Sequence, residues 1–194
     1  MNIFILYAAG FLIGSIPTGQ LIARSRGIDL RKKGSGNIGA TNVLRTAGRW
    51  PAIFTLVGDI AKGAAAVLLG RHFGAGPVQA GVIGLCAILG HNFSLFLKFR
   101  GGKGVATSIG VLSVYSPQTG LFTIIIWLMT VFISRYSSLA ALVSFGILPL
   151  SISLLDTREK LPVALVMTAL IFIRHRENIA RLARGQEPKV GSGR

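Results

Sequence analysis

Hydrophobic residues in this chain are gathered into long stretches that contain few or no charges. Such stretches occur at Ile3–Ala23, Trp50–Gly70, Val78–Leu97, Tyr136–Leu155 and, in a shorter form, Leu161–Ile173. A helix needs roughly 20 mostly apolar residues to cross a bilayer, and only helices or closed barrels satisfy their backbone groups in lipid. The pattern therefore predicts an all-α integral membrane protein.

A further stretch, from Gly104 to Ser134, has 31 residues without a charge. As one helix it would be about 46 Å long, whereas the hydrocarbon core is roughly 30 Å thick. The Ser116-Pro117 pair offers a break, which leaves 13 residues before it and 18 after it. We therefore predict two helices here, of which the first is short.

The distribution of Lys and Arg supports this division. With seven helices and the N-terminus outside, 17 of the 20 basic residues in the loops face the cytosol, whereas one long helix in place of two makes the ratio 12 to 8. Cytoplasmic loops carry the excess of positive charge in membrane proteins. We expect about seven transmembrane helices, the fourth short, with Met1 outside and Arg194 in the cytosol. No repeat or long linker divides residues 1–194, so one polytopic domain is expected.

Composition excludes several other classes. The chain is 51% hydrophobic and only 14% charged, which leaves too little polar surface for a soluble domain. Membrane orientation and attraction to lipid headgroups account for most of the net charge of +15, so no nucleic-acid partner is expected. Cys86 is the single cysteine and lies in an apolar run, where it is interpreted as a packing residue. The N-terminal stretch lacks a basic leader and is expected to remain as the first span.

The segment "GSGNIGATNVLR", Gly34 to Arg45, contains the glycine spacing of a dinucleotide-binding loop. It follows the charged run "RGIDLRKK" rather than a buried strand, so no nucleotide is expected. Its glycines can turn backbone N–H groups toward an oxyanion, and Arg45 adds a forked cation that suits phosphate. The alternative is a flexible loop whose arginine only obeys the charge rule. The candidate phosphate ligands are Ser35, Gly36, Asn37, Gly39, Thr41, Asn42 and Arg45.

A second glycine loop, "GGKG", comprises Gly101, Gly102, Lys103 and Gly104 and precedes the helix expected from Val105. A lysine between glycines at a helix N-terminus favours an anion. Gly104 stands where an ATP-binding loop needs Ser or Thr for magnesium, so ATP binding is not supported. The alternative is an interfacial loop with a helix-starting glycine.

Two polar pairs have helical spacing. His175 and Asn178, in "RHRENIARL", are three residues apart and can face the same pocket, although a lone interfacial histidine is often only a boundary residue. Asp59 and Lys62, in "GDIAKG", can face each other inside the bundle and are interpreted as a supporting ion pair. His91 carries less information, and His72 is interpreted as structural.

Several catalytic arrangements are missing from the sequence. The six acidic residues are scattered, so no carboxylate cluster for a catalytic metal is expected. No histidine is followed five positions later by aspartate, as the usual glycerolipid acyltransferase motif requires. Two anion-binding loops and a histidine remain at one cytosolic face. They suit an enzyme that joins a small phosphorylated substrate to a lipid-tailed one; a transporter of a phosphorylated solute or a structural membrane protein are the alternatives, although a transporter should show internal symmetry.

The motifs "GSGNIGATNVLR", "GDIAKG", "GHNFSLFLKFRGGKGVAT" and "RHRENIARL", in this order, closely resemble those of the bacterial acyl-phosphate:glycerol-3-phosphate acyltransferases. The resemblance spans Gly34 to Leu182. It implies an enzyme of the bacterial inner membrane with its active site on the cytosolic side. The reaction implied is transfer of a fatty acyl group from acyl phosphate to the sn-1 hydroxyl of glycerol 3-phosphate, which gives lysophosphatidic acid and phosphate.

The resemblance also implies roles for single residues. Ser35, Asn37, Thr41 and Arg45 would hold phosphate groups, and Lys103 would bind and neutralise the acyl phosphate. His175 and Asn178 would complete the pocket. Ser138 is retained, whereas Ala141 stands where the family often has a second serine. An acyl phosphate is already activated, so we expect no cofactor and no metal; either His175 or a substrate phosphate takes the hydroxyl proton.

Overall fold

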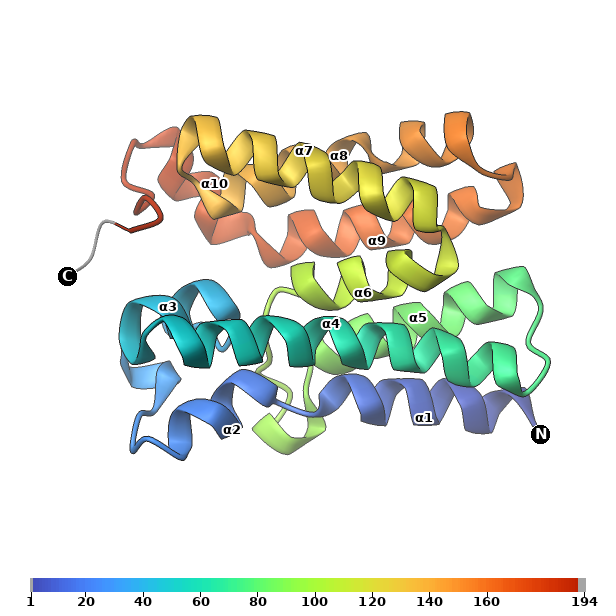
Figure 1. Cartoon of the computed structure of the whole chain (residues 1–194), viewed down its shortest axis with the longest axis horizontal. Helices are drawn as coiled ribbons and strands as arrows, with labels where there is room; N and C mark the ends of the chain where they lie inside the picture. The colour runs from blue at the N-terminus through green and yellow to red at the C-terminus, as the bar shows by residue number, and fades with distance from the viewer. Residues whose placement is uncertain (1, 192–194) are drawn as a thin grey trace.

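The computed structural model describes residues 2–191, and every regular element in this range is a helix (Figure 1). Met1 and residues 192–194, which include the predicted positions of both ends of the chain, lie outside the described residues. The longer helices run along the long axis of the molecule as a bundle. They are α1 (Ile3–Ser15), α4 (Arg49–His72), α5 (Pro77–Asn92), α6 (Val105–Tyr115), α7 (Pro117–Ser134), α8 (Ser137–Leu155) and α9 (Leu161–Arg174).

Short helices complete the chain between these segments. They are α2 (Thr18–Arg24), η1 (Leu30–Lys32), α3 (Ala40–Ala47), η2 (Leu95–Leu97), η3 (Arg158–Lys160) and α10 (Arg176–Ala183). In Figure 1, α2, α3 and α10 lie toward one end of the bundle, and the N-terminus lies at the other. The glycine-rich segments of the sequence therefore approach the same end.

The hydrophobic core forms where α4, α5, α6, α8 and α9 meet. Its largest buried members are Ile88, Leu112, Tyr115, Phe145, Leu148, Ile152, Met167 and Ile171. The helices α4 and α6 approach closely because small residues face each other between them. A Cβ atom at Gly63 would overlap the carbonyl of Thr107, and one at Gly110 would overlap the carbonyl of Ile60. Close approach through small residues is the usual way in which membrane helices pack.

Most of the predicted apolar segments form a single helix in the structure. Within residues 2–191, five segments are long and apolar enough to cross a membrane: Ile3–Arg24, Arg49–His72, Pro77–Leu97, Pro117–Ser134 and Ser137–Leu155. The long uncharged stretch is divided between Tyr115 and Pro117, as its length required. The shorter helices α6 and α9 have 11 and 14 residues. The count of seven spans and the direction in which they cross remain predictions.

The first predicted span is not one continuous helix. The helix α1 ends at Ser15 and α2 begins at Thr18, with Ile16 in an extended conformation before Pro17. Proline restricts the residue before it and cannot donate a backbone hydrogen bond, so the helix breaks at this position. At the break, the carbonyl of Ile16 accepts hydrogen bonds from the Thr18 N–H at 3.1 Å and from the Lys62 ammonium at 2.9 Å.

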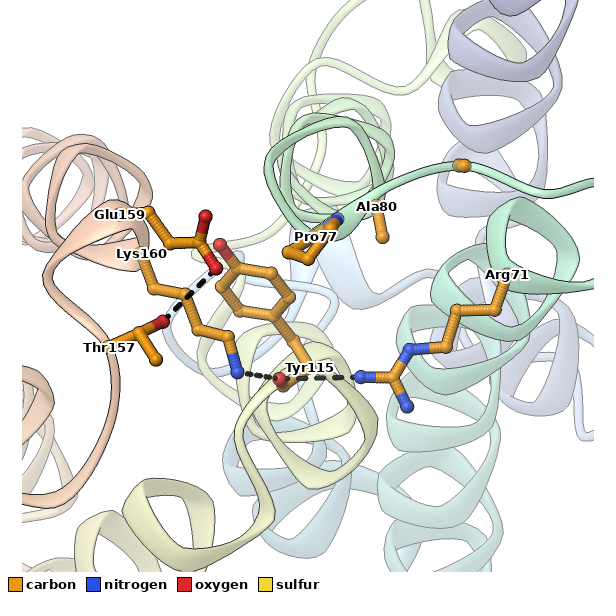
Figure 2. A pocket seen from close by; sticks show the side chains of 8 residues that line it. Arg71, Pro77, Ala80, Tyr115, Thr157, Glu159 and Lys160 are labelled. Atoms are coloured by element: carbon orange, nitrogen blue, oxygen red, sulfur yellow. Dashed lines mark hydrogen bonds between the residues drawn. The ribbon is translucent and has the colours of Figure 1, made fainter.

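At the end of the bundle opposite α2, α3 and α10, a polar cluster surrounds the last carbonyl of α6 (Figure 2). Arg71 and Lys160 both donate to the Tyr115 carbonyl, at 3.5 and 3.0 Å. Lys160 also pairs with Asp156 at 2.9 Å. Helix C-termini leave such carbonyls without intrahelical partners, so the two cations have a structural role in capping α6 beside a cavity of about 230 Å³.

Candidate active site

The loop that carries Lys103 is held on both sides by backbone hydrogen bonds. Gly101 and Gly102 donate their N–H groups to the carbonyls of Asn92 and His91, at 3.1 and 3.0 Å, so the loop folds back onto the end of α5. From the other side, the Arg174 guanidinium donates to the carbonyls of Gly101 and Gly102 at 2.9 to 3.3 Å. These contacts use both edges of the loop and leave the Lys103 side chain to enter the site.

The short length of α6 sets the depth of this loop. Its 11 residues span about 16 Å, roughly half of a hydrocarbon core of about 30 Å. Gly104 begins the helix in the left-handed conformation, with φ of 87°, and a Cβ atom there would also crowd the side chain of Asn92. The glycine at this position thus permits the sharp entry into a helix that starts inside the bundle (Figure 1).

Lys103 begins a chain of polar contacts that joins three distant segments. Its ammonium donates to the Asn178 side-chain oxygen, and the Asn178 amide donates to Glu187 Oε1 at 2.6 Å. Ser138 Oγ donates to the same carboxylate oxygen at 2.8 Å, and Arg181 Nε donates to Oε2 at 2.8 Å. The predicted residues Lys103, Asn178 and Ser138 are therefore brought together, with Glu187 at their centre.

The ionisable side chains in this series of contacts have shifted pKa values. Burial lowers the pKa of Lys103 to about 8, although the nearby Glu187 carboxylate opposes the shift. Burial would raise the pKa of Glu187, but hydrogen bonds from Arg181, Asn178 and Ser138 outweigh it and keep that pKa below its usual value. An incoming phosphate would meet a lysine whose charge is weakly solvated, and weak solvation strengthens its interaction with an anion.

His175 lies between α9 and α10 and is 3% exposed. Its Nδ1 is 2.8 Å from the carbonyl of Ile171, which fixes Nδ1 as the protonated nitrogen of the neutral ring. Burial, and then the positive charge of Lys103, lowers the pKa of His175 to about 4. The imidazole is therefore neutral near pH 7 and carries its lone pair on Nε2.

The first glycine loop is shaped by its own asparagines. The buried Asn42 amide donates to the carbonyls of Leu30, Lys33 and Asn37, and its oxygen accepts the N–H of Ser35 at 2.9 Å. Asn37 accepts the N–H of Gly39, also at 2.9 Å. The hydrogen bonds of Asn42 thus hold the loop in its conformation, while Ser35 and Gly36 remain exposed.

The helix after this loop presents Thr41 and Arg45 to other parts of the site. Thr41 Oγ1 lies 3.2 Å from Ser137 Oγ at the start of α8. Arg45 donates to the carbonyl of Pro188 at 3.1 Å. Since Glu187 is the neighbour of Pro188, both glycine loops approach the same C-terminal segment.

We call residues 185–190 the C-terminal strap, because this segment crosses from α10 to the junction of α7 and α8. The Val190 N–H donates to the carbonyl of Arg135 at 2.7 Å, and the Arg135 guanidinium donates back to the Val190 carbonyl at 3.3 Å. Glu187 was not predicted from the sequence. The feature that could have indicated it is the presence of one carboxylate between Arg184 and Lys189 in a basic segment.

A family model described as glycerol-3-phosphate acyltransferase matches residues 4–185. The chain belongs to the glycerol-3-phosphate acyltransferase family. A glycerol-3-phosphate acyltransferase of Mesorhizobium japonicum is 49% identical to it and covers 94% of this chain and 93% of the relative. The relative from Thermus thermophilus is 48% identical, with coverages of 93% and 92%.

Solved structures give the same assignment. A crystal structure of PlsY, described as an integral membrane glycerol 3-phosphate acyltransferase in the glycerol 3-phosphate form, is 37% identical and has a TM-score of 0.92. It covers 98% of this chain, which covers 96% of that one. A lysophosphatidic acid form of PlsY is 36% identical, with a TM-score of 0.90 and the same coverages. The protein is thus an integral membrane acyltransferase of this family.

Two predictions about supporting residues can be placed within this acyltransferase fold. Asp59 and Lys62 do face each other, with 2.8 Å between the carboxylate and the ammonium. Ala141 is 1% exposed within α8, while Ser138 one turn earlier provides the contact to Glu187. The hydroxyl that contacts Glu187 is that of Ser138.

Proposed function

We propose that this acyltransferase moves a fatty acyl group from acyl phosphate to the sn-1 hydroxyl of glycerol 3-phosphate, with lysophosphatidic acid and phosphate as products. The observation that carries the proposal is the convergence of Lys103, Asn178, Ser138 and Arg45 on the segment around Glu187. Cations and neutral donors meet there beside an apolar bundle. Such a place suits a phosphate whose acyl tail lies in the membrane.

The two anion-binding regions match the two phosphates of this reaction. Lys103 binds the acyl phosphate and neutralises its leaving phosphate, with Gly101, Gly102 and Gly104 giving the loop its shape. Ser35, Gly36, Asn37, Gly39, Thr41 and Arg45 hold phosphate groups, and Asn42 keeps their loop in its conformation. His175 and Asn178 complete the pocket. A charge-assisted hydrogen bond to phosphate contributes about 1.5–3 kcal/mol.

In the reaction, the sn-1 hydroxyl oxygen attacks the acyl carbonyl carbon, and the bond from that carbon to the phosphate oxygen breaks. A pKa of about 4 makes His175 a weak base near neutrality. We therefore assign the hydroxyl proton to a phosphate oxygen of the substrate. His175 accepts a hydrogen bond at Nε2. Charge neutralisation by Lys103 and positioning supply the catalysis.

The proposal requires neither a metal nor another cofactor. Within residues 2–191, His, Cys, Asp and Glu side chains form no group of three or more that could hold a metal ion. An acyl phosphate is a mixed anhydride, so its leaving group needs charge neutralisation more than Lewis-acid activation. We place the enzyme in the bacterial inner membrane, with the site facing the cytosol, where the phosphorylated substrate is dissolved.

A donor comparison tests the proposed function. The purified protein receives glycerol 3-phosphate with palmitoyl phosphate, palmitoyl-coenzyme A or palmitoyl-acyl carrier protein, each with and without a chelator. We expect lysophosphatidic acid from palmitoyl phosphate alone, at a rate that the chelator leaves unchanged. Robust product from either thioester and none from palmitoyl phosphate would overturn the donor assignment. A rate that falls on chelation would overturn metal independence.

A further inference from the structure

A buried polar cluster lies directly behind the glycine loop of Lys103, and the proposed reaction makes no use of it. It consists of Thr18 on α2, Asp59 and Lys62 on α4, and His91 on α5. Asp59, Lys62 and His91 are 2%, 6% and 3% exposed. Burying ionisable groups inside a membrane bundle is costly, so a cluster of this kind marks a function.

Asp59 is the centre of the cluster. Its Oδ1 accepts the hydroxyl of Thr18 at 2.5 Å and pairs with the Lys62 ammonium at 2.8 Å. Lys62 also donates to the Ile16 carbonyl, at the break before Pro17. His91 Nδ1 lies 3.5 Å from the same Asp59 oxygen. The charge pair is therefore satisfied without His91, and its carboxylate faces one side of the imidazole ring, whose buried Nδ1 has no hydrogen-bond partner among the described residues.

The other side of the His91 ring faces the glycine loop. A Cβ atom added to Gly102 would overlap His91 Nε2, the ring nitrogen farthest from Asp59. The backbone of His91 also supports the loop, because its carbonyl accepts the Gly102 N–H at 3.0 Å. The imidazole thus fills the space between Asp59 and the backbone that carries Lys103.

We propose that His91 is a positioning residue, packed between Asp59 and Gly102, that fixes the Gly101–Gly102 backbone so that Lys103 faces Asn178 and the incoming phosphate. This inference rests on the proposed role of Lys103 in phosphate binding. Arg174 holds the loop carbonyls from the opposite side, so the loop is clamped between α5 and α9. A displacement of about 1 Å at a catalytic group can lower a rate by about a hundredfold, which makes the support of the loop a catalytic requirement.

The shape of the contact between His91 and Gly102 permits a rescue experiment. Gly102→Ala should be nearly inactive, because the new methyl group meets the imidazole. His91→Ala should lower kcat by about tenfold to a hundredfold. The double variant His91→Ala/Gly102→Ala should be more active than Gly102→Ala alone, since the emptied space accepts the methyl group.

Gly101 supplies the matched control. A Cβ atom at Gly101 would overlap the backbone carbonyl of His91, which no side-chain substitution removes. His91→Ala should therefore fail to rescue Gly101→Ala. If His91→Ala does not yield folded protein, His91→Asn serves in its place, because the shorter amide keeps a polar group toward Asp59 and still empties the space beside Gly102.

A second readout is independent of the substrate. The rate at which acetic anhydride modifies Lys103, measured by mass spectrometry with the exposed Lys98 as internal reference, should rise in His91→Ala because the loop is released. A wild-type protein that makes no lysophosphatidic acid from palmitoyl phosphate would refute the proposed function and leave this readout valid. The positioning role is refuted by a Gly102→Ala variant as active as wild type, by a double variant no better than Gly102→Ala, by equal rescue of Gly101→Ala, or by unchanged Lys103 acetylation.

Discussion

Lys103 has an environment that a surface lysine lacks, since its ammonium is mostly withdrawn from water and held by the Asn178 side chain. Burial lowers its pKa from the ordinary 10.5 to about 8. Glu187 keeps the opposite charge nearby, with its own pKa held low by three hydrogen-bond donors. In our proposal Lys103 neutralises phosphate. Its charge therefore changes within the pH range in which enzymes are usually assayed.

The pKa of Lys103 predicts a pH dependence. Below about pH 8 the ammonium is protonated and binds phosphate, and above that value it becomes neutral, so kcat/KM for acyl phosphate should fall as the pH rises through about 8. In Lys103→Arg the guanidinium stays charged, so the fall should move to higher pH even where the overall rate is lower. Initial rates from about pH 6.5 to pH 9.5, corrected for spontaneous hydrolysis of palmitoyl phosphate, measure this. Identical profiles for the two proteins would contradict the assignment.

At the scale of elements, the C-terminal strap and the short helix α6 determine the shape of the site. The strap contacts α3 through Arg45, the junction of α7 and α8 through Arg135, and α10 through Asn178. The 11 residues of α6 keep the Lys103 loop below the end of the bundle. Two elements of unremarkable sequence therefore bring the polar groups together.

Removal of the strap carboxylate tests its contribution. Glu187→Ala should lower kcat/KM by roughly tenfold to a hundredfold, because Asn178, Ser138 and Arg181 lose a charged acceptor whose hydrogen bonds contribute about 1.5–3 kcal/mol. Glu177→Ala is the matched control, since that side chain is 74% exposed and lies 3.9 Å from Arg176. Exposed ion pairs contribute little, so its rate should stay within about twofold of wild type. Equal effects at the two positions would argue against a specific role for Glu187.

Hydropathy was sufficient to predict the longer apolar helices, because lipid imposes a similar length and polarity on each span. The division at Ser116-Pro117 followed from length and from the distribution of Lys and Arg, and the ion pair of Asp59 with Lys62 followed from helical spacing. The break at Pro17 was not predicted, because the apolar run continues through it. The positions of Glu187 and His91 depend on contacts between segments distant in sequence, which no local periodicity reports.

On the scale of the whole molecule, the direction of insertion decides whether the site meets its soluble substrate. The predicted arrangement puts both glycine loops and α10 on the cytosolic side and the cluster around Tyr115 outside. Five crossings then separate Ser25 from Thr157. If α6 and α7 crossed the membrane as one unit, four crossings would separate them, and both would face the same side.

Cysteine labelling distinguishes these arrangements. In a Cys86→Ser background, Ser25→Cys and Thr157→Cys each place one thiol at an exposed position. We expect a membrane-impermeant maleimide to label Thr157→Cys in spheroplasts and Ser25→Cys only in inverted vesicles, because the basic loops lie in the cytosol. Labelling of both positions from one side would refute seven spans with opposite termini.

The C-terminal strap has a consequence for biosynthesis. The first glycine loop, the Lys103 loop and Glu187 are separated by most of the chain, and a ribosome delivers them to the membrane in that order. A nascent chain inserted only as far as α8 has its lysine and its first loop, but it still lacks Asn178 and the carboxylate that joins them. If the proposed site is correct, a partly synthesised protein has no complete site, and we expect activity only after residue 187 has left the ribosome.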